Sequence, residues 1–142
     1  MGSMDLMIPG KSKKEILITS YICHPSMANN ELSGPLIIMA LSKILKKSYY
    51  SVRLLLIPET IGAINYINKN FKSLQKNLIA GFNITCVGDG GPVSYVRSKD
   101  EVTYADKIAK RVLKKFKHKS ISFLNRGCLL YTSDAADEEE SV

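Results

Sequence analysis

The sequence lacks any long hydrophobic run. No stretch of about 18 apolar residues, the minimum for a membrane-spanning helix, occurs in the 142-residue chain. The first residues, MGSM, lead into no hydrophobic segment of the kind that forms a secretory signal. These two absences predict a cytoplasmic protein.

Cysteine is scarce as well, with three residues in the chain. An odd and small number does not suit a disulfide framework and favours a reducing compartment. Cys23 and Cys86 both fall in apolar, strand-like runs. Because free cysteine is among the most buried residue types, this setting favours core thiols over metal ligands.

Motifs for phosphate and nucleic-acid binding are missing. The glycine-rich turn at 88–92 has no GxxxxGK[ST] context, which argues against a phosphate-binding loop. The net charge is +7, but no aromatic residues alternate with the basic ones in a recognised nucleic-acid motif. We expect no nucleic-acid or membrane partner, although a basic stripe on the helix expected over 104–117 leaves that alternative open. The stripe consists of Lys107, Lys110, Arg111, Lys114, Lys115 and Lys117.

Apolar periodicity predicts an α/β fold with a parallel-rich central sheet flanked by helices. Runs rich in β-branched residues, with little alternation, are typical of strands that are covered on both faces. Such strands are expected at 15–23, 51–57 and 78–87, with shorter extended segments at 4–8 and 93–97 and a last strand or turn at 121–125. Helical spacing predicts helices over 32–47, 61–71 and 104–117, the second with an apolar stripe of Ile61, Ile64, Ile67 and Phe71.

Polar residues follow each of the three main strands. His24 comes after the first, Glu59 after the second, and Asp89 in the turn after the third. The carboxyl ends of parallel strands form the ligand-binding edge of an open α/β sheet. A neutral imidazole together with an oxygen ligand from residues 29–31 would suit a metal ion. The alternative is structural: residues 29–31 and Glu59 cap helices, and His24 is a hydrogen-bonded loop residue.

Three ordered motifs carry a resemblance to a known family. They are YICHPSMANNELSGP at 21–35, LIPETIGAI at 56–64 and GFNITCVGD at 81–89. Together they resemble the aminopeptidase-like domain of bacterial polysaccharide-biosynthesis-associated proteins. The fold of that family is similar to the co-catalytic zinc exopeptidases, with an aminopeptidase/glutaminyl-cyclase-like arrangement.

The resemblance implies a zinc-dependent peptidase site. It assigns His24, Asn30 and Asp89 as metal ligands and Glu59 as the general base. It also implies hydrolysis of a peptide or another amide of a small amine-bearing substrate, in surface polysaccharide biosynthesis. Zinc would polarise the carbonyl and activate water, while a carboxylate would move the proton.

The chain departs from the pattern of zinc exopeptidases at three positions. Asn30 stands where a bridging aspartate is expected, Thr60 where a second glutamate is, and Thr85 where a ligand aspartate is. Amides and hydroxyls are poorer ligands than carboxylates and do not offset the charge of two zinc ions. Glu31 and Asp89 are the expected substitutes. A catalytically inactive, peptidase-like binding module is therefore the alternative to an enzyme.

The resemblance covers residues 2–127 and implies that this domain is incomplete. Residues 128–142 contain no Lys or Arg, hold five of the 13 acidic residues, and have no repeating apolar face. They resemble translated read-through of a sequencing adapter. We expect residues 1–127 to form part of a zinc-aminopeptidase-like domain, inactive by itself, and residues 128–142 to be a foreign and disordered tail.

Overall fold

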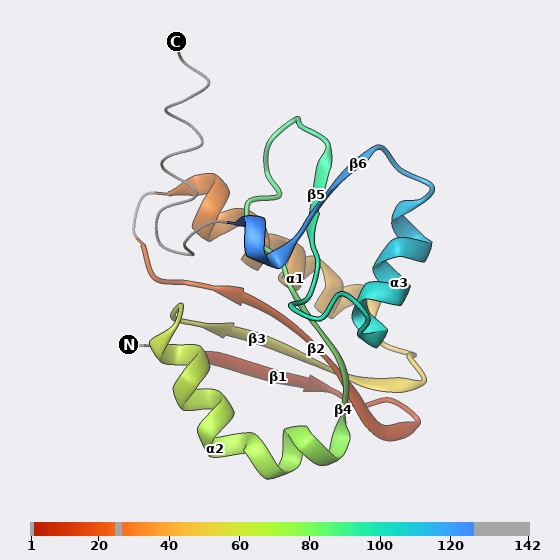
Figure 1. Ribbon diagram of the computed structural model, residues 1–142. Coiled ribbons are helices and arrows are strands. Elements are labelled where there is room, and N and C mark those ends of the chain that lie inside the picture. The colour runs from red at the N-terminus through yellow and green to blue at the C-terminus, as the bar shows by residue number, and fades with distance from the viewer. Residues whose placement is uncertain (1, 25–26, 127–142) are drawn as a thin grey trace. The chain divides into compact units, whose positions relative to one another are not determined.

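The computed structural model describes residues 2–24 and 27–126. The chain forms two units, Met1–Asp89 and Gly90–Val142, each with a sheet of its own. Both units combine helices with strands (Figure 1), which confirms the predicted α/β class. Among the described residues, no helix combines the length and the apolar composition that crossing a bilayer requires. The tail predicted at 128–142 lies outside the described residues.

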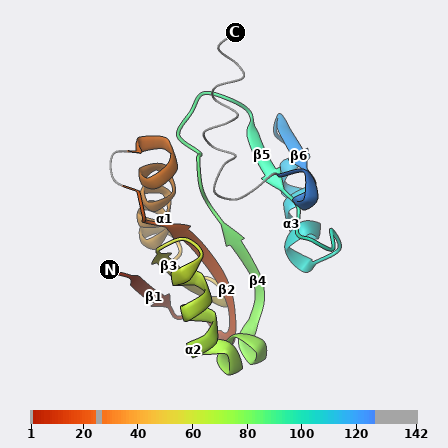
Figure 2. The same cartoon turned by 60° about the vertical axis from the view of Figure 1, so that its left-hand side comes forward.

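The first unit is built on a mostly parallel sheet. Its elements are β1 (Met4–Ile8), β2 (Ser12–Tyr21), α1 (Ser33–Ile44), β3 (Tyr50–Ile57), α2 (Ile61–Asn77) and β4 (Leu78–Asn83). The strand order is β1-β3-β2-β4, with β2 parallel to both β3 and β4, and β1 antiparallel to β3. Figure 2 shows β2 and β4 side by side. The sheet therefore agrees with the parallel-rich arrangement predicted from the apolar runs.

The face of the sheet beneath α1 carries the apolar core. Val52, Leu54 and Leu56 alternate along β3 and cluster with Ile38 of α1. Leu54 and Ile38 are completely buried. Because successive side chains of a strand point to opposite faces, the residues between these, including Arg53, face the other side.

That other face carries a charged cluster beneath α2. Arg53 of β3 bonds Asp5 of β1 at 2.9 Å and Glu15 of β2 at 3.2 Å. Tyr66 of α2 donates a hydrogen bond of 2.8 Å to Asp5. Burial and this hydrogen bond raise the pKa of Tyr66 to about 12, so the hydroxyl stays a donor at neutral pH. The cluster ties three strands and a helix together.

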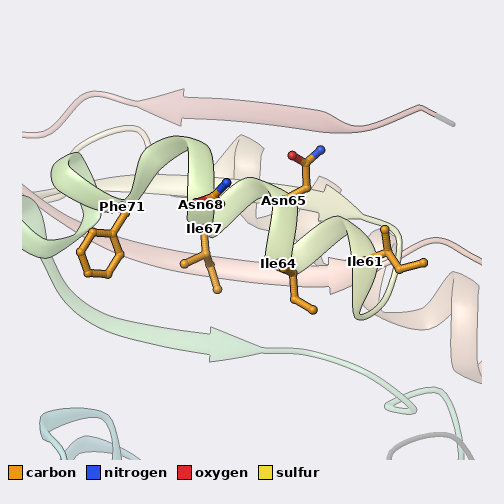
Figure 3. Close-up of a pocket in the computed structure, with 6 residues that line it drawn as sticks. All are labelled: Ile61, Ile64, Asn65, Ile67, Asn68 and Phe71. Atoms are coloured by element: carbon orange, nitrogen blue, oxygen red, sulfur yellow. The ribbon is translucent and has the colours of Figure 1, made fainter.

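The apolar stripe predicted for the second helix does not meet the sheet. Ile61 and Ile64 are 80% and 64% exposed, and Ile67 and Phe71 are also exposed. Figure 3 shows Ile64, Ile67 and Phe71 pointing to one side of α2, and together with Ile61, Asn65 and Asn68 they line an open apolar groove. The helix instead directs Tyr66 and the buried Leu74 inward. The periodicity located the helix correctly, but not the face that packs on the sheet.

The second unit is a small β-α-β element. It contains β5 (Val93–Val96), α3 (Tyr104–Leu113), β6 (His118–Ile121) and a 3-10 turn (Phe123–Arg126). β5 and β6 are parallel, and α3 begins with a capping box formed by Thr103 and Asp106. α3 ends at Leu113, four residues before the predicted end. All six residues of the predicted basic stripe are exposed.

Candidate functional site

The candidate site lies where the chain leaves β2. The last backbone bond to β3 runs from Ile22 N–H to the carbonyl of Ile57, at 3.1 Å. Adjacent side chains of an extended strand point to opposite faces. Cys23 and His24 follow the end of β2 at Tyr21, so their side chains are not held on opposite faces of the sheet. Both side chains contact Glu31.

Cys23, His24 and Glu31 form a compact group of potential metal ligands. His24 Nδ1 lies 3.2 Å from Cys23 Sγ and 3.2 Å from Glu31 Oε1, and Sγ lies 3.6 Å from Oε1. The ligand atoms of the three residues all lie within 4.8 Å of one another. The Glu31 side chain is 9% exposed and that of His24 is 49% exposed, so the group opens to solvent on the histidine side. We refer to these three residues as the Cys23 triad.

The position of Glu31 depends on an irregular helix start. Residues Ala28–Leu32 form a π-helical turn that leads directly into α1. Such turns are rare in proteins, and those that occur are often found at functional sites. The backbone N–H of Cys23 donates a 2.6 Å hydrogen bond to Glu31 Oε2. The other carboxylate oxygen, Oε1, therefore faces Cys23 Sγ and His24 Nδ1. One carboxylate oxygen is thus held by the backbone while the other completes the triad.

Negative charge gathers around the Cys23 thiol. Burial raises the pKa of Cys23, a hydrogen bond from the Glu59 backbone lowers it, and the charges of Glu31 and Glu59 raise it further, with a net increase. The pKa of Tyr21 is also raised, first by burial and further by Cys86, Glu59 and Glu31, against a hydrogen bond with Thr85. Glu59, the predicted general base, therefore lies within electrostatic reach of the triad.

Asn30 belongs to a neighbouring network of neutral groups. Its Oδ1 accepts a short hydrogen bond from the Tyr21 hydroxyl and a longer one of 3.4 Å from Thr85 Oγ1. Thr85 also donates to the Tyr21 hydroxyl at 2.6 Å, and Cys86 Sγ lies 3.5 Å from the same amide oxygen. The structure thus brings together Asn30 and Thr85, two of the positions where a carboxylate was expected.

Asp89 lies beside Asn29. Its Oδ2 accepts a 3.4 Å hydrogen bond from Asn29 Nδ2, and Asn29 Oδ1 accepts one of 2.7 Å from the Gly88 N–H. Ser33 Oγ accepts from the Val87 N–H at 3.1 Å and donates to the Asn29 carbonyl. The turn after β4 is therefore fastened to the π-helical turn.

The ligand roles predicted for His24, Asn30 and Asp89, and the catalytic role of Glu59, stay predictions. The structure adds Cys23, which sequence reasoning assigned to the core although it is only half-buried. Its position directly before His24 at a strand end was the available signal. The core assignment of Cys86 is wrong: β4 ends at Asn83, and Cys86 is exposed with a φ of 50°.

Gly34 determines how closely α1 approaches the sheet at this site. A Cβ at this position would collide with Ser20 Oγ and with the backbone carbonyl of Ile84. We expect Gly34→Ala to destabilise the first unit by about 1–3 kcal/mol, because a backbone atom cannot rotate away. Urea unfolding measures this. Gly81→Ala is the matched control, since a Cβ at Gly81 meets nothing within 4 Å, and an equal loss in both variants would contradict the steric explanation.

Comparison with known proteins agrees with this fold. A Clostridium acetobutylicum protein named as a polysaccharide biosynthesis protein with an aminopeptidase-like domain is 45% identical over 108 residues. That match covers 75% of this chain and 25% of the relative. A crystal structure at 2.37 Å resolution of a C. acetobutylicum protein assigned as a peptidase superposes with a TM-score of 0.80 and 40% identity. It matches 85% of this chain and 29% of the solved chain.

These matches confirm the resemblance carried by the three motifs: the chain is similar to part of a protein named for an aminopeptidase-like domain and to part of a solved protein assigned as a peptidase. The chain belongs to the family described as Domain of unknown function (DUF4910), whose model matches residues 1–133. It spans between a quarter and a third of the length of the two relatives.

Proposed function

We propose that this chain supplies the metal-binding part of a zinc-dependent, aminopeptidase-like hydrolase that acts on a peptide or another amide in surface polysaccharide biosynthesis. The observation that carries the proposal is the convergence of His24 Nδ1 and Glu31 Oε1, at 3.2 Å. Glu59 lies within electrostatic reach of the adjacent Cys23 thiol. Imidazole nitrogen and carboxylate oxygen are both ligands of zinc. The relatives named above support the peptidase-like class and the link to polysaccharides.

The donor set fits one zinc ion better than two. Catalytic zinc sites use three protein ligands and leave a fourth position open. Asn30 and Thr85 form a neutral network with Tyr21 and bring no negative charge to a second ion. We therefore propose a single ion at His24 and Glu31. The ligand roles of Asn30 and Asp89 would matter only for a second ion.

Bound zinc would polarise the scissile carbonyl and acidify a water molecule. We assign the proton transfer to Glu59, which comes just after β3 in the chain, as His24 comes just after β2. Its carboxylate would accept a proton from the attacking water as the oxygen bonds to the carbonyl carbon. It would then deliver that proton to the amine as the carbon–nitrogen bond breaks. The substrate would be a peptide or a small molecule with an amide-linked amine.

The Asn30 network favours a second candidate, a non-catalytic binding module. Where a bridging carboxylate would hold a second ion, the structure has a hydrogen-bonded amide. Such a module would hold a peptide or an amine-bearing ligand in the same location without cleaving it.

Zinc stoichiometry and hydrolysis together test the proposal. We expect the purified chain to bind about one zinc ion by elemental analysis, and His24→Ala to lose it. Because the chain by itself is expected to be inactive, hydrolysis is measured on the complete protein that contains this domain, where Glu59→Gln should keep the zinc and lose hydrolysis of aminoacyl amides. His118→Ala is the control, because this histidine lies in the second unit and contacts the carbonyl of Phe116.

Two results would overturn the proposal. Zinc binding without turnover in the complete protein that contains this domain would favour the binding module. A folded chain that binds no zinc would leave His24 as a hydrogen-bonded loop residue, the structural alternative that the sequence left open.

A further inference from the structure

We infer that Cys23 is the third protein ligand of the proposed zinc site, so that the ion is held by a thiolate, an imidazole and a carboxylate. This inference rests on the proposed metal site and extends it to a residue that the three motifs do not mark as a ligand. Its consequence is a preference for zinc and cobalt over magnesium, calcium and manganese, because thiolate sulfur is a soft ligand.

The spacing of the Cys23 triad matches the edges of a coordination tetrahedron. With metal–ligand distances of about 2.0–2.3 Å, neighbouring ligand atoms of tetrahedral zinc lie about 3.3–3.6 Å apart. The three edges of the triad measure 3.2, 3.2 and 3.6 Å. Binding thus requires shifts of only a few tenths of an ångström in the ligand positions.

The surroundings of the triad hold this geometry. The Cys23 N–H fixes Glu31 Oε2 at 2.6 Å, so the carboxylate is oriented by a group outside the ligand set. Such outer partners are a regular feature of metal sites. The 49% exposure of the His24 side chain leaves an open side, which suits a fourth ligand from water or substrate.

Cys86 provides a contrast within the same unit. It too is a free thiol, but it is exposed and its Sγ lies beside the Asn30 amide and the Thr85 hydroxyl. Neither neighbour is a strong zinc ligand. A matched pair of cysteines, one inside a ligand group and one outside it, is therefore available for experiment.

Cobalt substitution tests the inference directly. Co²⁺ titrated into the chain should produce visible d–d bands together with a near-ultraviolet sulfur-to-cobalt charge-transfer band. Cys23→Ser should lose the charge-transfer band and bind zinc at least about tenfold more weakly, since even outer-shell losses cost about 10–100-fold. Cys86→Ser should retain both properties.

The possible outcomes separate this inference from the proposed function. Visible bands without the charge-transfer band in the wild-type chain would overturn the role of Cys23 and leave the His24 and Glu31 site intact. No cobalt spectrum in a folded chain would overturn both.

A second measurement needs no variant, and so guards against a Cys23→Ser protein that fails to fold. Zinc should protect Cys23 from iodoacetamide, and peptide mass spectrometry should show Cys86 alkylated at an unchanged rate. Equal rates at Cys23 with and without bound zinc would contradict thiolate ligation.

Discussion

Replacing Arg53 with methionine is expected to lower the free energy of unfolding of the first unit by about 3–5 kcal/mol. The guanidinium lies between Asp5 and Glu15, and the Glu15 side chain is only 4% exposed. Methionine retains much of the length of the side chain but leaves the Glu15 carboxylate buried without a cation. Urea unfolding followed by circular dichroism measures the loss.

A double variant distinguishes charge from packing at this position. Glu15→Gln combined with Arg53→Met removes both charges, and we expect it to recover more than half of the lost stability. Lys69→Met is the control for losing one positive charge, because Lys69 is exposed on α2. Equal destabilisation in the single and double variants would show that the Arg53 side chain acts by packing alone.

Asp106→Asn is expected to destabilise the second unit by about 3–5 kcal/mol. The buried Asp106 carboxylate accepts hydrogen bonds from the Tyr95 hydroxyl at 2.6 Å, from Ser98 N–H and Oγ, and from Thr103 N–H and Oγ1. An amide has one oxygen, and its NH2 group would face donors. Hydrogen exchange of α3 and β6 should accelerate, while β2 and β3 serve as the internal reference.

The same carboxylate makes the second unit sensitive to acid. Burial alone would raise the pKa of Asp106, but hydrogen bonds from Ser98, Thr103 and Tyr95 outweigh it and hold the pKa well below the ordinary value of 3.8. A lowered folded pKa contributes stability that is complete above the unfolded value and lost as the pH falls below it. Protection of α3 should therefore decline below pH 3.8 in the wild type.

The variants give this pH dependence a clear test. Asp106→Asn cannot titrate at this position, so its stability should be lower throughout and should lack this part of the acid dependence. Asp100→Asn removes an exposed carboxylate from the same unit and should behave as the wild type does. The Asp106 assignment would be wrong if Asp106→Asn kept the full acid dependence.

The sequence alone located the main elements of the first unit, because they depend on local patterns. Apolar runs located β2 and β3, and helical spacing located α1 and α2. Proline at 58 and the polar loop from His24 onward placed two candidate residues at strand ends. Parallel pairing then required those ends to lie at the same edge of the sheet. Periodicity is short-range information, and it sufficed for the fold class.

Only the tertiary structure decided which side chains meet. Cys23 joined His24 because β2 ends at Tyr21, and Glu31 joined them through a π-helical turn that no spacing rule predicted. Cys86 lies outside the core because β4 ends at Asn83, four residues before its predicted end. The exposed stripe of α2 shows the same limit: amphipathicity does not reveal that Tyr66 must reach Asp5. Such contacts depend on backbone ends and long-range partners, which an apolar pattern does not encode.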